Sequence, residues 1–103
     1  MYEIQHLIDG QAVASASGNT GPVFDPATGE QVGQVGLASV AEVDAAVASA
    51  RSASGEWGEV SLARRTKLML EFRNLVVANA DEVAKRLTAE HGKVLDDARG
   101  EVA

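Results

Sequence analysis

The sequence changes character within VGQVGLASVAEVDAAV, residues 32–47. Upstream of it lie short β-like runs separated by Gly, Asn and Pro. Its second half contains Ser39 and, three residues later, Glu42, a capping box that marks the start of a helix. Apolar residues then recur at helical spacing at Val43, Ala46, Val47 and Ala50. We therefore expect strands and turns in residues 1–38 and helices in residues 39–103, an α+β arrangement.

The N-terminal part begins with a predicted β-hairpin. Residues 2–8 form the first run, with a two-residue period. The apolar face of this run carries Tyr2, Ile4 and Ile8. Asp9 and Gly10 separate it from a second run, residues 11–14. Asp-Gly between two such runs is typical of a type I′ turn, in which both central residues have positive φ.

A second turn is predicted over residues 25–30, after a polar loop of residues 15–21. Within this turn the Asp25 side chain can accept a hydrogen bond from the backbone ahead of it, and Gly29 permits a left-handed residue. The turn leads into the last β-like run, residues 32–37.

The first two helices are delimited by turn residues and caps. We expect the first helix to end at Ser54 and Gly55, with Trp57 in the connecting loop. The second helix begins near Ser61. Its predicted apolar stripe consists of Leu68, Phe72, Leu75 and Val76. Its predicted solvent face consists of Arg64, Arg65, Lys67, Glu71 and Arg73.

A third helix is expected to begin at Asn79 as N-cap and to end at Gly92 with a left-handed residue. Its surface is expected to carry ion pairs between residues four apart, with the acid first. These pairs are Asp81 with Lys85 and Glu82 with Arg86.

A fourth helix is predicted to begin at Leu95. Asp96 and Asp97 lie in its first turn, where the helix dipole favours carboxylates. No C-cap precedes Ala103, and we interpret this ending as a cut within a longer helix.

Composition excludes several classes of function. The chain has 103 residues, enough for one small domain, and a net charge of −6, which argues against nucleic-acid binding. It has no apolar run long enough to span a membrane. The N-terminus lacks the basic start and apolar stretch of a signal peptide, so we expect a cytoplasmic location. The absence of cysteine removes disulfides, thiolate metal sites and a cysteine nucleophile.

The remaining residues indicate neither a nucleophilic catalytic site nor a metal site. The two histidines, His6 and His91, lie in no catalytic motif, and we expect the first to be structural and the second to lie at a helix end. Asp96 and Asp97 fit a helix start better than a metal site. We therefore assign no catalytic and no metal-binding residue.

Phosphate binding is not expected either. The glycines Gly29, Gly33 and Gly36 match neither the dinucleotide fingerprint nor a P-loop, so no cofactor-binding residue is assigned. The basic residues of the second helix are expected to form a solvated face.

Three segments, taken in order, resemble the aldehyde dehydrogenase superfamily. The first is Leu7-Ile8-Asp9-Gly10 with residues 23–32, which resembles an opening hairpin followed by an N-P-x-T-G-E turn, with Asp25 in place of the usual Asn. The second, residues 41–48, is similar to the family's first helix, with Trp57 after it. The third, residues 87–102, is similar to the E-x-G-K end of the third helix and the segment after it. This third segment looks most like methylmalonate-semialdehyde dehydrogenases.

The resemblance implies an N-terminal fragment of the α/β cofactor-binding domain of an NAD-dependent enzyme. Those enzymes oxidise malonate or methylmalonate semialdehyde and pass the acyl group to coenzyme A. The attacking Cys, the Glu base and the Asn that stabilises the oxyanion all lie downstream of the matched residues. The implied partners are the remainder of the polypeptide and, in the full-length family, further copies of the enzyme. We expect this chain to be inactive alone and to bind neither NAD nor coenzyme A.

Other interpretations remain open at this point. The chain is alternatively a free-standing structural or interaction domain without catalytic function. It is also compatible with a fragment of another aldehyde or succinate-semialdehyde dehydrogenase, because substrate choice lies in other segments. A small independent enzyme is disfavoured, since neither a Cys nor a His-based constellation is present.

Overall fold

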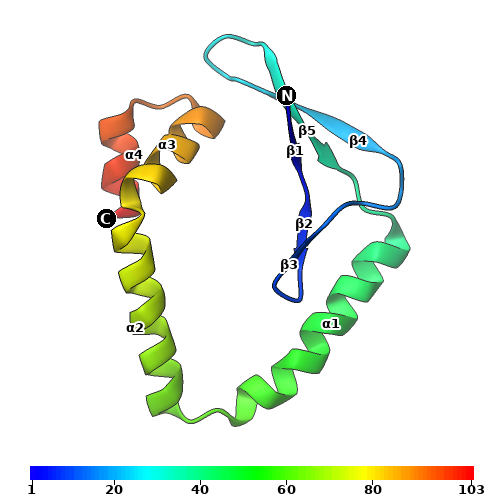
Figure 1. Ribbon diagram of the computed structural model, residues 1–103, viewed down its shortest axis with the longest axis vertical. Coiled ribbons are helices and arrows are strands. Elements are labelled where there is room, and N and C mark those ends of the chain that lie inside the picture. Colours follow the sequence, from blue (N-terminus) through cyan, green and yellow to red (C-terminus); the bar gives the residue numbers. More distant parts are fainter. The chain divides into compact units, whose positions relative to one another are not determined.

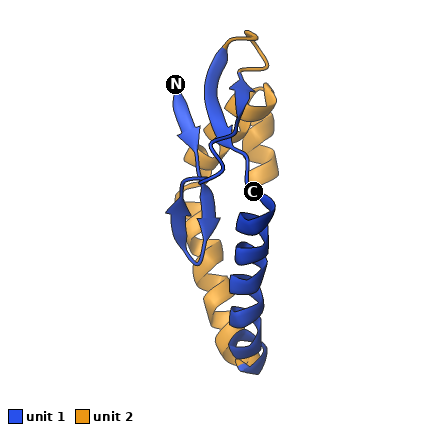
Figure 2. Ribbon diagram, turned by 90° about the vertical axis from the view of Figure 1, so that its right-hand side faces the viewer, with its two compact units in different colours: residues 1–24, 31–59 blue, residues 25–30, 60–103 orange.

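The computed structural model describes residues 1–103. The chain forms two compact units, which Figure 2 colours separately. The first unit contains Met1–Phe24 and Gln31–Glu59, and the second contains Asp25–Glu30 and Val60–Ala103. None of the helices is long and apolar enough to cross a membrane.

The first unit contains all five strands (Figure 1). They are β1 (Tyr2–Ile4), β2 (His6–Ile8), β3 (Gln11–Val13), β4 (Thr20–Phe24) and β5 (Gln31–Gly36). β5 is the central strand of a three-stranded sheet, with β1 parallel on one side and β4 antiparallel on the other. β2 and β3 form a separate antiparallel hairpin. Strands precede helices along the chain, so the predicted α+β arrangement is confirmed.

The prediction of one strand over residues 2–8 is wrong, because this run is divided at Gln5. β1 pairs with β5, about thirty residues away in the sequence, whereas β2 pairs with its neighbour β3. A two-residue period does not show which partner a strand takes, and so it cannot reveal the division.

The polar loop is also shorter than predicted, because β4 begins at Thr20 and includes Gly21 and Pro22. Proline has no backbone N–H to donate, but it is tolerated in an edge strand such as β4. The edge position thus explains a strand where the sequence indicates a loop.

Both predicted turns are confirmed by their backbone geometry. Asp9 and Gly10 have φ of 51° and 72°, as a type I′ turn requires. In the second turn the Asp25 carboxylate accepts a hydrogen bond from the backbone N–H of Ala27 at 2.8 Å. Gly29 has φ of 75°, and its N–H donates to the carbonyl of Asp25. An Asp at this position thus supplies the side-chain oxygen that an Asn would supply.

Two glycines of β5 allow close approach of neighbouring segments. A Cβ at Gly33 would lie 2.8 Å from the carbonyl oxygen of Tyr2, and a Cβ at Gly36 would lie 2.8 Å from the Cβ of Ser15. Real Cβ atoms essentially never come so close. Both glycines are buried, so the sheet depends on the absence of a side chain at these positions.

The first helix, α1 (Val40–Glu59), is longer than predicted. Gly55 and Trp57 lie within it and not beyond its end. A glycine in a helix interior costs only about 1 kcal/mol, which a helix of 20 residues tolerates. The second helix, α2 (Leu62–Ala78), begins as predicted, with the Ser61 hydroxyl accepting a hydrogen bond from the N–H of Arg64.

The second unit ends in a pair of packed helices, α3 (Ala80–His91) and α4 (Leu95–Val102). Ala84 of α3 and Ala98 of α4 are fully buried. The predicted left-handed end of α3 is confirmed, because Gly92 has φ of 82°. Asn79 is the N-cap residue as predicted, but its side chain donates to the carbonyl of Leu75 and does not cap α3.

The predicted ion pairs on α3 are wrong in their partners. Asp81 pairs with Arg99 of α4 at 2.9 Å, and Arg99 also contacts Asp96. Glu82 pairs with Lys85, three residues away, at 2.6 Å. Surface pairs of this kind are weak, and a basic residue supplied by α4 is enough to redirect Asp81.

Very little apolar side-chain surface is buried in this chain. Ala84 and Ala98 are its only buried hydrophobic residues, and no large side chain is fully buried. The predicted apolar stripe of α2 is largely exposed, with Phe72 at 58% and Leu75 at 63%. The apolar stripe of α2 therefore stays a prediction, because nothing within the second unit covers it.

We predict that Gly33→Ala disrupts the pairing of β1 with β5. The added methyl group overlaps the Tyr2 carbonyl oxygen, which lies 2.8 Å from its position. Overpacking of this kind costs about 1–3 kcal/mol. Hydrogen exchange of the β1 and β5 amides measures the loss of protection.

Gly55→Ala is the matched control, because a Cβ at Gly55 meets nothing within 4 Å. Removing a glycine from a helix interior is expected to stabilise α1 by roughly 0.5–1 kcal/mol. Equal protection of the β1 and β5 amides in the two variants would contradict the close-approach interpretation.

Candidate functional site

The sequence candidates for chemistry are not brought together within either unit. His6 lies in β2 of the first unit, and His91 lies in the last turn of α3 in the second unit. Asp96 is engaged by Arg99, three residues further along α4. No three His, Cys, Asp or Glu side chains are placed to hold a metal ion.

The glycine-containing segment does not fit the phosphates of a dinucleotide. Gly33 and Gly36 lie within β5 against Tyr2 and Ser15, so neither is open to a ligand. A helix N-terminus follows at Val40, which would be the usual place for an anion. The carboxylate of Glu42 already accepts hydrogen bonds there. We therefore assign no step of NAD chemistry to these residues.

Glu42 joins the start of α1 to the loop after β3. Its carboxylate accepts hydrogen bonds from the backbone N–H and the hydroxyl of Ser39, at 2.8 and 2.9 Å. It also accepts from the backbone N–H of Ala16 at 2.6 Å and from the hydroxyl of Ser15 at 3.3 Å. The N–H of Glu42 donates in return to the Ser39 hydroxyl, which completes the predicted capping box.

These hydrogen bonds favour the charged form of the carboxylate. The bond from the Ser39 N–H has the largest effect, followed by those from the Ala16 N–H and the Ser39 hydroxyl. Together they lower the pKa of Glu42 from 4.5 to about 2. Glu42 is thus a permanent anion in the physiological pH range, and its role is to link the loop after β3 to the start of α1.

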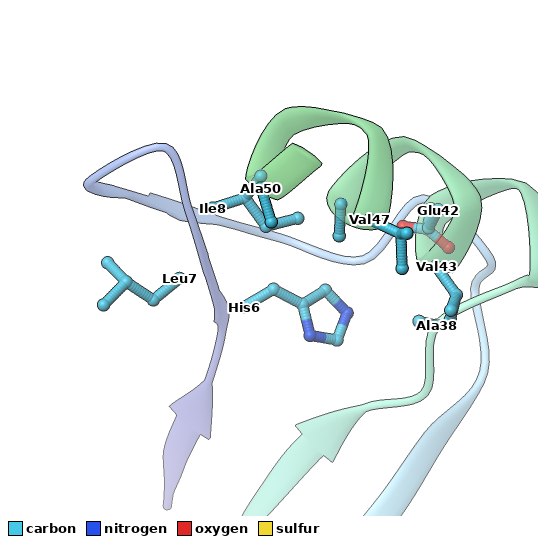
Figure 3. A pocket seen from close by; sticks show the side chains of 9 residues that line it. His6, Leu7, Ile8, Ala38, Glu42, Val43, Val47 and Ala50 are labelled. Atoms are coloured by element: carbon cyan, nitrogen blue, oxygen red, sulfur yellow. The ribbon is translucent and has the colours of Figure 1, made fainter. Parts of the chain in front are cut away.

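An apolar groove lies beside Glu42, between the β2–β3 hairpin and α1 (Figure 3). Its volume is about 440 Å³. The residues that line it are His6, Leu7, Ile8, Ala38, Glu42, Val43, Ala46, Val47 and Ala50. His6 and Ile8 point toward α1, whereas Leu7 points away from it. The ring Nε2 of His6 is buried and has no hydrogen-bond partner, so His6 contributes packing here.

A second hollow, about 230 Å³, lies next to this groove along α1 and reaches Ser49 and Ala53. Both hollows belong to the first unit. The sequence predicted the apolar stripe of α1, but it contained no signal that the β2–β3 hairpin would form the opposite wall.

The basic face of α2 is the remaining candidate. Arg64 and Lys67 border a hollow of about 630 Å³ on this helix together with Ser61 and Glu71. Arg65 differs from the prediction of a solvated residue, because it is only partly exposed and its Nε is buried without a hydrogen-bond partner. A single helix face with an acidic residue among the basic ones does not define an anion site.

Residues 12–103 match the aldehyde dehydrogenase family model. The chain belongs to the aldehyde dehydrogenase family. It is 46% identical over 99 residues to malonate-semialdehyde dehydrogenase 3 of Geobacillus kaustophilus, covering 96% of this chain and 20% of that protein. It is 38% identical to the human mitochondrial methylmalonate-semialdehyde/malonate-semialdehyde dehydrogenase (acylating), covering 96% of this chain and 18% of that protein.

A solved structure gives the same result for the fold. The putative methylmalonate-semialdehyde dehydrogenase of Sinorhizobium meliloti, complexed with NAD, matches with a TM-score of 0.93 and 46% identity. The match covers 98% of this chain and 21% of that protein. The chain therefore has the fold of the N-terminal fifth of an aldehyde dehydrogenase, and it spans about a fifth of the relatives' length.

The pKa of Glu42 predicts how the loop after β3 responds to pH. The folded-state pKa is depressed, so the stabilisation is complete above pH 4.5 and is lost as the pH falls toward about 2. We expect the amide NMR signals of Ala16 and Ser39 to titrate together with a midpoint near pH 2, because they report the carboxylate in the folded state. In Glu42→Gln, these signals should show no such titration and should resemble the acid form at neutral pH.

Glu56→Gln is the matched control, because Glu56 is an exposed glutamate on the same helix. This variant should leave the titration of the two amides unchanged. An unaltered titration in Glu42→Gln would show that another group controls the loop.

Proposed function

We propose that residues 1–103 form the N-terminal part of the cofactor-binding domain of an NAD-dependent, coenzyme A-acylating aldehyde dehydrogenase. The strand part, residues 1–38, and the helical part, residues 39–103, both belong to that domain. The full-length protein would oxidise malonate or methylmalonate semialdehyde to an acyl-CoA. The main support is the identity of 46% to a malonate-semialdehyde dehydrogenase over 96% of this chain.

Within that enzyme we assign this chain the role of scaffold. The chain has no cysteine, and its two histidines lie in different units. The glycines of β5 allow neighbouring segments to approach the sheet closely. The carboxylate of Glu42, whose pKa is strongly lowered, holds the loop after β3. We therefore assign this chain no catalytic, cofactor-binding or metal-binding residue and expect it to be inactive alone.

Coenzyme A dependence is proposed from two observations. The segment from Glu90 to Val102 resembles methylmalonate-semialdehyde dehydrogenases, and one relative carries the description "acylating". The proposed partners are the remainder of the polypeptide and further copies of the full-length enzyme. The cytoplasmic location expected from the N-terminal sequence stays a prediction.

The second candidate is a free-standing structural or interaction domain. A domain of that kind would unfold in one sharp transition at low concentration and stay monodisperse. We expect this chain to aggregate or to depend on a partner, because both α1 and α2 carry exposed apolar residues. Trp57, the only tryptophan, lies 45% exposed in α1 and reports on unfolding by its fluorescence.

The decisive measurement is coenzyme A-dependent turnover by the full-length gene product that contains this sequence. We expect NADH and an acyl-CoA from each of the two semialdehydes, and no NADH from the 103-residue chain alone. Succinate semialdehyde and reactions without coenzyme A serve as controls. Equal turnover of succinate semialdehyde, or free acid as the product, would contradict the proposed substrate and acylation.

A further inference from the structure

Two of the segments that resemble family motifs meet within the second unit. They are the turn of residues 25–30 and the end of α3. A Cβ at Gly92 would lie 3.1 Å from the Cγ of Pro26 and 3.5 Å from its Cβ. The strands β4 and β5 belong to the first unit, but the turn that joins them belongs to the second (Figure 2). The proposed scaffold role does not explain this contact.

The turn holds Pro26 in a defined place. The N–H of Asp25 donates to the carbonyl of Glu30 at 2.9 Å, and the N–H of Gly29 donates to the carbonyl of Asp25 at 2.8 Å. The Asp25 carboxylate also accepts from the N–H of Ala27 at 2.8 Å. The pyrrolidine ring itself fixes φ of Pro26 at about −65°. The ring can therefore yield little to a neighbouring group.

The segment opposite the ring is held as well. The N–H of Gly92 donates to the carbonyl of Thr88 at 2.8 Å, which ends α3. The next side chain, Lys93, forms an ion pair with Glu101 of α4 and is only 16% exposed. Gly92 thus lies in a fixed stretch of backbone, with no side chain between it and Pro26.

A surrounding core does not press these two residues together, because both are exposed apart from this contact. A Cβ at 3.1 Å from the ring would be closer than nine in ten real Cβ contacts. At Gly29, which also has a positive φ, a Cβ would meet nothing within 4 Å. The end of α3 requires only the left-handed backbone of Gly92, whereas the approach of Pro26 requires the absence of a side chain.

We propose that the turn of residues 25–30 holds the α3–α4 pair through the seating of Pro26 on the bare backbone of Gly92. Gly92 then has two roles, since it ends α3 and also admits the proline ring. Pro26 is a positioning residue for the loop that joins α3 to α4. The inference goes beyond the proposed function and does not depend on it.

Disulfide formation tests the contact directly. The chain has no cysteine, so Pro26→Cys with Gly92→Cys introduces its only two thiols. Their Cβ atoms would lie 3.5 Å apart, within the range of roughly 3.5–4.5 Å found in disulfides. The control is Gly29→Cys with Gly92→Cys, which places one thiol elsewhere in the same turn. We expect the first pair to form the intramolecular disulfide about tenfold faster or more, as measured by mass spectrometry at low concentration.

Hydrogen exchange tests whether the contact holds the turn. Gly92→Asn introduces a residue that tolerates the left-handed conformation but adds a side chain. We expect exchange of the Asp25 and Gly29 N–H groups to speed up by about fivefold or more, because the ring is displaced. Gly18→Asn is the matched control, since Gly18 has φ of 75° and a Cβ there meets nothing within 4 Å.

Pro26→Ala completes the cycle. It removes the Cγ and leaves only a Cβ at 3.5 Å, an ordinary van der Waals distance. Compared with Pro26→Ala alone, the addition of Gly92→Asn should therefore leave the exchange of the turn amides nearly unchanged.

Faster disulfide formation in the first pair, together with turn exchange that responds to Gly92→Asn only when Pro26 is present, supports the proposal. Equal rates in the two thiol pairs, or no disulfide in either, overturn it. Turn exchange that Gly92→Asn leaves unchanged shows that Gly92 serves only the end of α3, and an effect that persists without Pro26 shows another route; both overturn it. Neither measurement involves turnover, so the proposed function is tested separately.

Discussion

The carboxylate of Glu42 fixes the geometry of the first unit. It caps the start of α1 through Ser39 and holds the loop after β3 through the N–H of Ala16 at 2.6 Å. Ser15, in the same loop, also lies against Gly36 at the end of β5. The same few contacts therefore set the end of the sheet, the direction of α1 and the position of the hairpin beside it. The groove between the hairpin and α1 lies beside this charged group.

Small residues supply the close contacts in both units. Gly33 and Gly36 allow Tyr2 and Ser15 to lie close to the central strand β5. Ala84 and Ala98 are the buried residues of the α3–α4 pair. Contacts of this kind bring backbones together but bury little apolar area, and burial of apolar area is the main source of folding stability. The large apolar side chains lie outside these contacts. The architecture is thus well specified locally while its apolar surface is left uncovered.

The sequence predicted most of the local structure, because capping and turn chemistry act over a few residues. The Asp9-Gly10 turn, the Asp25 turn, the caps at Ser39 and Ser61 and the end at Gly92 are all confirmed. Two errors are local, namely the end of α1 at Gly55 and the pairing of Glu82 with Lys85. Others concern partners that are distant in the sequence. The pairing of β1 with β5, the redirection of Asp81 to Arg99 and the second function of Glu42 each depend on a residue from another element. For the same reason the apolar stripe of α1 was predictable, but the hairpin wall of its groove was not.

The proposed scaffold role accounts for two features that would be contradictory in an independent domain. An independent domain needs a covered core, and an enzyme needs groups poised for chemistry. This chain has helix caps, turns and close backbone contacts of good geometry. The apolar residues of α1 and α2 are nevertheless exposed. The Glu42 carboxylate is used in a helix cap and not for chemistry. Both features are expected if local interactions only shape the segment and the downstream polypeptide covers it.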